Sequence, residues 1–315
     1  MKRNMTRSFV IIAACLFLAQ AVTTRGQQMA DPDFDTKVAR PAYTKKQPKV
    51  LFDEAHRNFH TTDGRYKPFA TLITNDGYQV TPNKEKFQKS TLNGYDILVI
   101  ANASGPDANL GAAAKESAFT DEECDVVRDW VRAGGSLLLI ADHSPYGSAA
   151  ENLGKRFGVD MSKGYTADPE NYDKESNNQG LIIYTRESGR LANHPITRGR
   201  NASERINRII AFTGQSLKGP ADSIAFMKLA ASAIDQFPKP GGEREKPDVS
   251  AAGRAQGIAM RVGRGRVVML GEAAMLSAQV IKRPNQPDFR MGMNVSGIDN
   301  RQFALNTMHW LSHLL

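Results

Sequence analysis

Cysteine is nearly absent from this chain, whose 315 residues contain Cys15 and Cys124 and no others. Cys15 lies in an apolar N-terminal run that we interpret as part of a signal peptide, so the mature protein would keep Cys124 alone. A single cysteine excludes an internal disulfide framework, and the fold must depend on a hydrophobic core instead. Cys124 shares a predicted helix face with apolar residues, which favours a small buried side chain over a reactive thiol.

Motifs for covalent catalysis and for phosphate binding are missing as well. The chain contains no G-x-S-x-G or G-x-C-x-G turn, which would expose a nucleophile between a strand and a helix. Gly263 and Gly265 flank Arg264 in a predicted hairpin rather than before a helix, so they do not form a phosphate-binding loop. The chain also has no internal repeat, which argues against a repeat architecture.

A basic stripe is lacking, although basic residues outnumber acidic ones by 41 to 33 and the formal net charge is +8 at pH 7. The basic residues are scattered along the chain and are not interleaved with aromatic residues. This distribution is typical of a solvated surface and argues against nucleic acid as a partner.

The N-terminal apolar run, residues 9–22, is too short to cross a bilayer comfortably. It follows three basic residues and contains a small-x-small pattern at residues 19–21, as a secretory signal peptide does. We expect residues 1–21 to be removed and the protein to be exported, either to the periplasm or out of the cell, with no membrane span left. Residues 12–15 resemble a lipoprotein attachment box, but the run stays apolar beyond Cys15, which favours ordinary cleavage over lipid anchoring.

Strand and helix patterns alternate along the first half of the remaining chain. Residues 50–53, 78–81, 95–101 and 136–141 are predicted strands, and the last two contain continuous apolar runs, typical of strands buried on both faces. Helices are predicted near residues 65–75, after a capping box of Thr120 and Glu123, and after Pro145. The alternation predicts an α/β fold with a doubly wound, mostly parallel sheet of flavodoxin-like or amidotransferase-like type.

Patterns in the second half are weaker. Residues 159–180 and 236–255 are rich in polar residues, glycine or proline, which predicts an inserted loop and a mobile excursion. Residues 258–262 and 266–270 predict a C-terminal hairpin, and residues 281–297 predict a loop long enough to act as a lid. Asp299 is expected to cap the final helix. We assign residues 22–48 to a linker and residues 49–315 to a single domain.

Acidic and imidazole side chains follow three of the predicted strands. The carboxyl ends of parallel strands lie along one edge of a sheet, so these side chains are expected to converge there. Such a cluster suits a pocket for a small polar ligand, with a sugar as one candidate. The candidate ligand-binding residues are Asp53, Glu54, His56, His60, Asp142, His143 and Glu272.

The same residue types also suit a divalent metal such as zinc, with an open position for water. In this alternative the protein is a metal-dependent hydrolase, in which His56, His143 and Asp142 hold the metal and Glu54 or Glu272 is the general base. The spacing matches no known ligand motif, so the sequence leaves both alternatives open. If the protein is an enzyme, the catalytic candidates are His143, Asp142 and Glu272.

Several segments stand in a recognisable order: DEAHRNFH after the first strand, YDILVIAN, the capped helix, GGSLLLIADHSPYG with its helix, GRVVMLGEAAML and the terminal helix. From residue 49 to the C-terminus this order resembles the class I glutamine-amidotransferase-like superfamily. More narrowly, the chain is similar to exported bacterial domains of unknown function that are grouped with gliding-protein and intraflagellar-transport-type domains and with the trimerisation domain of some β-galactosidases. The resemblance implies an amidotransferase-like fold.

The resemblance also bears on the activity. Glutaminases of this superfamily carry a nucleophilic cysteine in the turn after the strand that matches residues 136–141, where this chain has Asp142 and His143. Cysteine-dependent glutamine hydrolysis is therefore not expected. The related trimerisation and transport-associated domains imply a third alternative, a non-catalytic assembly domain that forms oligomers. Ligand binding at the strand ends remains the leading hypothesis.

Overall fold

The computed structural model describes residues 28–45, 47–106, 114, 116–238, 244–283 and 286–315. The predicted signal peptide, residues 1–21, lies outside the described residues, and so does the alternative lipid-attachment residue Cys15. None of the helices in the described part of the chain is both long enough and apolar enough to span a membrane.

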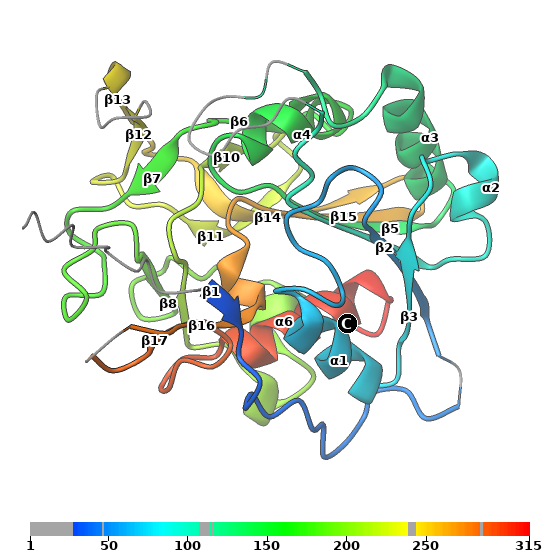
Figure 1. Ribbon diagram of the computed structural model, residues 1–315, viewed down its shortest axis with the longest axis horizontal. Helices are drawn as coiled ribbons and strands as arrows, with labels where there is room; N and C mark the ends of the chain where they lie inside the picture. The colour runs from blue at the N-terminus through cyan, green and yellow to red at the C-terminus, as the bar shows by residue number, and fades with distance from the viewer. Residues whose placement is uncertain (1–27, 46, 107–113, 115, 239–243, 284–285) are drawn as a thin grey trace, which may run out of the picture.

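A nine-stranded sheet forms the centre of the described structure (Figure 1). Its order is β3-β2-β4-β5-β15-β14-β10-β6, and β11 also pairs with β14. The strands from β3 to β15 are mutually parallel, whereas β14 runs antiparallel to β15. The fold is therefore mixed α/β with a large, mostly parallel sheet. The strands of this sheet are β2 (Lys49–Asp53), β3 (Gln79–Asn83), β4 (Ile97–Ala101), β5 (Ser136–Ile140), β6 (Asp160–Met161), β10 (Leu217–Lys218), β11 (Ile224–Lys228), β14 (Ala255–Val262) and β15 (Gly265–Leu270).

Three smaller sheets accompany the central sheet in the described structure and include segments that were predicted to be loops. The predicted lid, residues 281–297, contains β17, and the predicted excursion, residues 236–255, contains β13. Short strands also occur in the predicted inserted loop, residues 159–180. The smaller sheets consist of β1 (Gln28–Ala30) with β16 (Ala278–Ile281) and β17 (Phe289–Gly292), of β7 (Tyr165–Ala167) with β12 (Ile234–Pro238) and β13 (Arg244–Ser250), and of β8 (Ile183–Thr185) with β9 (Arg208–Ile210).

Helices pack against both faces of the central sheet, as Figure 1 shows, with α2, α3 and α4 above the sheet and α1 and α6 below it. Alternate residues of each strand contact the two layers: Leu98 and Ile100 pack in one core and Ile97 and Val99 in the other. Because both faces are covered, the central strands are continuously apolar. The helices are α1 (Lys67–Asn75), α2 (Lys89–Leu92), α3 (Asp121–Arg132), α4 (Tyr146–Lys155), α5 (Pro195–Arg198) and α6 (Asn300–Leu311), with 3-10 turns η1 (Ala202–Glu204) and η2 (Ala274–Leu276).

Two local predictions are confirmed. Thr120 and Glu123 form the capping box of α3: the hydroxyl accepts from the Glu123 N–H at 3.2 Å, and the carboxylate accepts from the Thr120 N–H at 3.0 Å. Cys124 lies one residue later on the buried face, where burial raises the pKa of its thiol to about 12. Such a thiol stays protonated and unreactive in the folded protein.

The segment predicted to be a linker, residues 22–48, is structured from Gln28 onward. Residues 28–30 form β1, which pairs antiparallel with β16. Farther along, the Tyr43 ring packs against Tyr78 at a centroid distance of 5.2 Å, and the N–H of Ala42 donates to the Asp76 carboxylate at 2.8 Å. These contacts attach residues 28–45 to the rest of the described structure, and sequence periodicity did not indicate them because the segment is polar and irregular.

Candidate functional site

A cavity of about 420 Å³ lies at the carboxyl edge of the parallel strands. Polar residues after β4, β5 and β15 form its floor, and the loop between β2 and α1 forms one wall. The sheet of β1, β16 and β17 contributes to the opposite side. The lining residues are Gln28, Phe59, His60, Arg65, Asn102, Asp142, His143, Tyr146, Asn178, Leu181, Phe212, Thr213, Glu272, Ala274, Gln279, Phe289 and Met291.

Asp142 and Asn102 lie together on the cavity floor because Asn102 directly follows β4 and Asp142 lies two residues after the end of the neighbouring parallel strand β5. The N–H of Asp142 donates to Oδ1 of Asn102 at 3.0 Å. Asn102 adopts a positive φ of 51°, a backbone conformation that asparagine tolerates better than most residues. Among the described residues, no hydrogen bond to the Asn102 side-chain nitrogen occurs, which leaves this donor available to a ligand.

His143 is held by two contacts, one of which fixes the tautomer of its neutral ring. Its Nδ1 lies 2.9 Å from the carbonyl oxygen of Ser144, an atom that can only accept, so Nδ1 carries the proton. The ring stacks on Tyr165 with centroids 4.0 Å apart. In the neutral ring, Nε2 keeps its lone pair and lies 3.8 Å from Oδ1 of Asp142, too far for a direct hydrogen bond. Nε2 can therefore accept from a ligand hydroxyl.

Glu272 is a fully buried carboxyl group at the end of β15. Its two oxygens accept from the N–H groups of Ala274 at 2.6 Å and Met275 at 2.8 Å. Burial, together with the nearby charge of Asp142, nevertheless raises the pKa of Glu272 to about 8. The carboxyl group is therefore mostly protonated at neutral pH and can donate a hydrogen bond.

His60 lines the cavity and is 3% exposed. Burial lowers the pKa of His60 to about 3, and the positive charge of Arg65 adds to this, so the ring is neutral. Its Nδ1 is buried and has no hydrogen-bond partner among the described residues. An unpaired buried polar atom is unfavourable, so His60 Nδ1 is an unsatisfied group in the wall of the cavity.

Asp53 ends β2 and Glu54 and His56 follow it, but none of the three lines this cavity. The His56 ring is buried between two carboxylates, with Nδ1 2.9 Å from both Asp53 oxygens and Nε2 2.9 Å from Oε1 of Glu123. Burial lowers the pKa of His56, but the hydrogen bonds to Asp53 and Glu123 outweigh it and raise the pKa overall. Glu54 accepts from the N–H of Thr62 at 2.7 Å and pairs with Lys84. These residues hold the loop after β2 in place.

The predicted zinc ligands do not meet at one centre. Both ring nitrogens of His56 are taken up by carboxylates, whereas His143 and Asp142 line the cavity. Within the part of the chain that the structure describes, no group of three or more His, Cys, Asp or Glu side chains is arranged to hold a metal ion. The residues His56, His143 and Asp142 thus do not fit a common zinc site.

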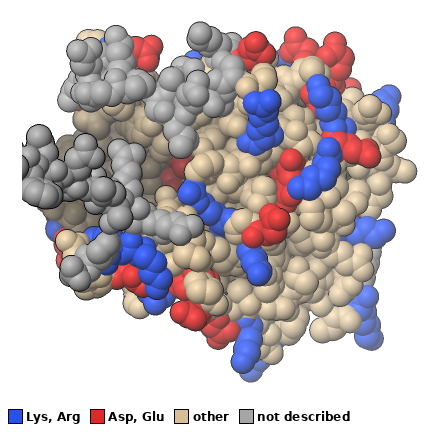
Figure 2. All heavy atoms as spheres, viewed as in Figure 1, with Lys and Arg blue, Asp and Glu red and all other residues tan. Residues whose placement is uncertain are grey.

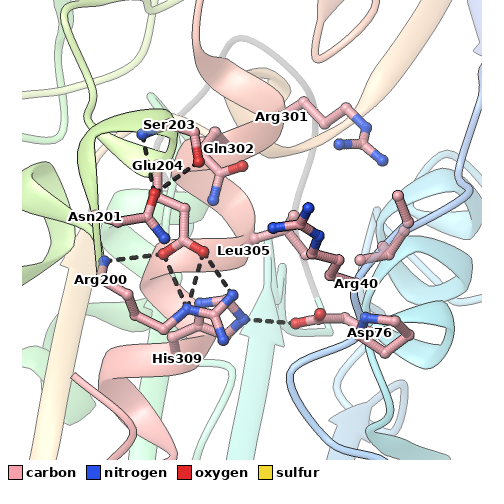
Figure 3. Close-up of a pocket in the computed structure, with 13 residues that line it drawn as sticks. Arg40, Asp76, Arg200, Asn201, Ser203, Glu204, Arg301, Gln302, Leu305 and His309 are labelled. Atoms are coloured by element: carbon pink, nitrogen blue, oxygen red, sulfur yellow. Dashed lines mark hydrogen bonds and ion pairs between the residues drawn. The ribbon is translucent and has the colours of Figure 1, made fainter.

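A larger cleft of about 740 Å³ lies beside α6 and the end of α1 (Figure 3). Its charged side chains largely pair with one another: Arg200 binds Glu204 at 2.5 Å, and His309 binds Asp76 at 2.6 Å. These four side chains are thus paired, although the buried Nδ1 of His309 has no hydrogen-bond partner among the described residues.

The structure brings His60, Asp142, His143 and Glu272 to the same cavity, at the edge where the sequence predicted convergence. The sequence analysis did not select Asn102. This residue comes just after β4, as Asp142 comes shortly after β5, so the expectation that polar residues after parallel strands converge applied to it equally. The cavity residues from β1, β16 and β17 have no comparable sequence signal.

No protein-family model and no curated protein matches the sequence. Among solved structures, the chain is similar to "mmIFT52 N-terminal domain", with a TM-score of 0.57 and 14% identity over 84% of this chain and 97% of that chain. It is also similar to a putative GMP synthase protein from Thermoplasma acidophilum, with a TM-score of 0.43 and 9% identity over 86% of this chain and 96% of that chain. At these identities the likeness concerns the fold alone.

Proposed function

We propose that the protein binds a small polar ligand, of which a sugar is the best example, in the cavity at the strand ends. The observation that carries this proposal is the convergence of Asn102, Asp142, His143 and Glu272 on one cavity floor. Together these groups offer donors and acceptors that are not fully used within the described part of the protein. A hydroxylated ligand needs such a mixture, because each hydroxyl group both donates and accepts.

The size of the cavity supports the same proposal. At about 420 Å³ it lies in the lower part of the range for small-molecule pockets, which suits a ligand of one or two sugar rings. Phe59 and Tyr146 add aromatic surface to the lining, against which the apolar face of a sugar can pack.

We further propose that the fold is amidotransferase-like and doubly wound. The helices on both faces of the sheet and the similarity to the mmIFT52 N-terminal domain support this assignment. In that arrangement the turn after β5 carries Asp142 and His143 in place of a nucleophilic cysteine. The proposal is therefore ligand binding rather than thiol chemistry. Export of the protein and its assembly into oligomers stay predictions.

Thermal unfolding in the presence of monosaccharides and disaccharides tests the binding proposal. A ligand present at about 100 times its dissociation constant stabilises the folded state by about 2.7 kcal/mol, which raises the melting temperature by several degrees. We expect at least one sugar to give this shift. The shift should be lost in Asp142→Asn and kept in Asp63→Asn, which removes an exposed carboxylate outside the cavity. A panel without any shift, or a shift unchanged in Asp142→Asn, would contradict the proposal.

A further inference from the structure

We infer that the ligand of this cavity carries a carboxylate, as a hexuronic acid does, and that the Arg65 guanidinium binds it. The inference rests on the proposed function, since it concerns the same cavity, and it narrows the ligand from polar compounds to acidic ones. It is carried by the arrangement of Arg65, Phe59 and His60 in the wall between β2 and α1.

Arg65 is a cation without an anionic partner among the described residues. Its side chain is partly buried and lines the cavity, and within the described ranges no hydrogen bond or ion pair holds its guanidinium. Burial lowers the pKa of Arg65, which reflects the loss of hydration around the charge. A partly buried charge that lacks a partner is unfavourable unless a counter-ion compensates it. A ligand carboxylate would supply that compensation.

Packing holds the guanidinium in a defined place. Its central carbon lies 4.3 Å from the centroid of the Phe59 ring, and this ring contacts His60 and Tyr146 at centroid distances of 5.2 and 5.6 Å. Contact with an aromatic ring leaves the N–H groups at the guanidinium edge free to bind both oxygens of a carboxylate. The arginine is therefore positioned in advance, which reduces the entropy lost on binding.

His60 belongs to the same wall and does not oppose an anionic ligand. The ring is neutral, so it adds no charge, and its buried Nδ1 has no partner among the described residues. It lies in the same wall as Phe59 and Arg65 and provides a polar ring beside the position of the ligand anion.

The acidic residues of the cavity do not oppose an anionic ligand. Asp142 and Glu272 are the two acidic residues among the lining residues that the structure describes, and burial raises the pKa of Glu272 to about 8, which favours its neutral form. The cavity thus has a cationic wall at Arg65 and a hydrogen-bonding floor at the strand ends. A uronic acid has matching parts, a carboxylate at one end and hydroxyl groups along the ring.

Matched pairs of sugars test the inference. The dissociation constants of D-glucuronate and D-galacturonate are measured by calorimetry at low salt and compared with those of glucose and galactose, for the wild type, Arg65→Gln, Arg65→Lys and Lys67→Gln. Lys67→Gln removes an exposed positive charge two residues away, outside the cavity, and controls for non-specific attraction. Melting curves without ligand verify that each variant is folded.

We expect one of the acids to bind at least tenfold more tightly than its neutral counterpart. Arg65→Gln should remove this preference and leave the affinity for the neutral sugar nearly unchanged, Arg65→Lys should retain part of it, and Lys67→Gln should keep it. If acid and neutral sugars bind equally well and Arg65→Gln changes neither, the inference is wrong while the proposed function stands. If none of the four sugars binds, the inference is wrong, and the wider panel of sugars decides the proposed function separately.

Discussion

Glu272 is buried after the end of β15, and its surroundings shift its pKa in opposite directions. The backbone N–H groups of Met275, Ala274 and Phe212 favour its charged form, whereas burial and the neighbouring Asp142 favour its neutral form and dominate. A carboxyl group whose pKa is raised on folding binds a proton more tightly in the folded state than in the unfolded state. Its contribution to stability is therefore complete below about pH 4.5 and is lost as the pH rises through about 8.

This residue predicts a specific pH dependence. Between pH 5 and pH 9 the free energy of unfolding should fall more steeply for the wild type than for Glu272→Gln, because the amide does not titrate. The variant loses a hydrogen bond, so the comparison concerns the slope and not the absolute stability. Urea unfolding at several pH values measures both slopes. Equal slopes would show that Glu272 is ionised in the folded protein throughout this range.

At the scale of secondary structure, the sheet of β1, β16 and β17 determines one side of the cavity. Asp31 follows β1 and is buried, and its Oδ2 accepts from Arg290 at 2.7 Å and from Asn294 at 2.8 Å. These bonds join the N-terminal strand to the β17 region. Phe289 and Met291 of β17 line the cavity, so their position depends on this junction.

Asp31→Asn should loosen this side of the cavity. Loss of the carboxylate weakens two hydrogen bonds, one of them to a half-exposed arginine, and should destabilise the protein by about 1–2 kcal/mol. Hydrogen exchange should become faster in β1, β16 and β17 and stay unchanged in β4 and β5. Asp33→Asn, an exposed carboxylate two residues away, is the control. Unchanged exchange in β16 and β17 of Asp31→Asn would mean that other contacts hold them.

Some elements were predictable because one short pattern determines each of them. Continuous apolar runs located β4 and β5, Thr120 and Glu123 located the start of α3, and the glycines around Arg264 located the β14–β15 hairpin, in which Val262 pairs with Gly265. Because the predicted strands were expected to be parallel, their carboxyl ends were expected at one edge of the sheet. The convergence of Asp142 and Glu272 on one cavity was therefore predictable as well.

Other features depend on contacts that no local pattern contains. His56 was expected at the cavity, but Glu123, which the capping box already explains, also accepts a hydrogen bond from His56 across 67 residues. Strand β1 is three residues of ordinary composition, and its partner β16 lies about 250 residues later. Arg65 carries no sequence signal, because its importance comes from the lack of an anionic partner among the described residues of the folded protein.

At the scale of the whole molecule, Figure 2 shows basic and acidic side chains interspersed over the visible face, without a large patch of one sign there. The N-terminal segment, residues 28–45, contributes to both the core and the cavity. Phe34, Val38 and Tyr43 pack against the core below the sheet, and Gln28 lines the cavity. The N-terminal segment therefore contributes both to stability and to the proposed binding site.

A chain that begins at Lys49 should melt several degrees below one that begins at Gln28, because it loses these apolar contacts and the pairing of β1 with β16. It should also bind ligand more weakly, since Gln28 and the Asp31 junction are missing. Calorimetric melting of the two chains, and of the full-length chain as a reference, measures the effect. Equal melting temperatures would support the assignment of residues 22–48 as a linker.

The Nε2 of Gln28 donates to Oε1 of Gln279 at 2.7 Å, although 251 residues separate them along the chain. During synthesis β1 is made first, and it stays unpaired until its partner strand β16 has been synthesised. The parallel strands β2, β4 and β5 are complete long before then, so the sheet can assemble before the cavity closes. Nascent or prematurely terminated chains would therefore contain a folded centre without a closed cavity, and only nearly complete chains would be competent to bind.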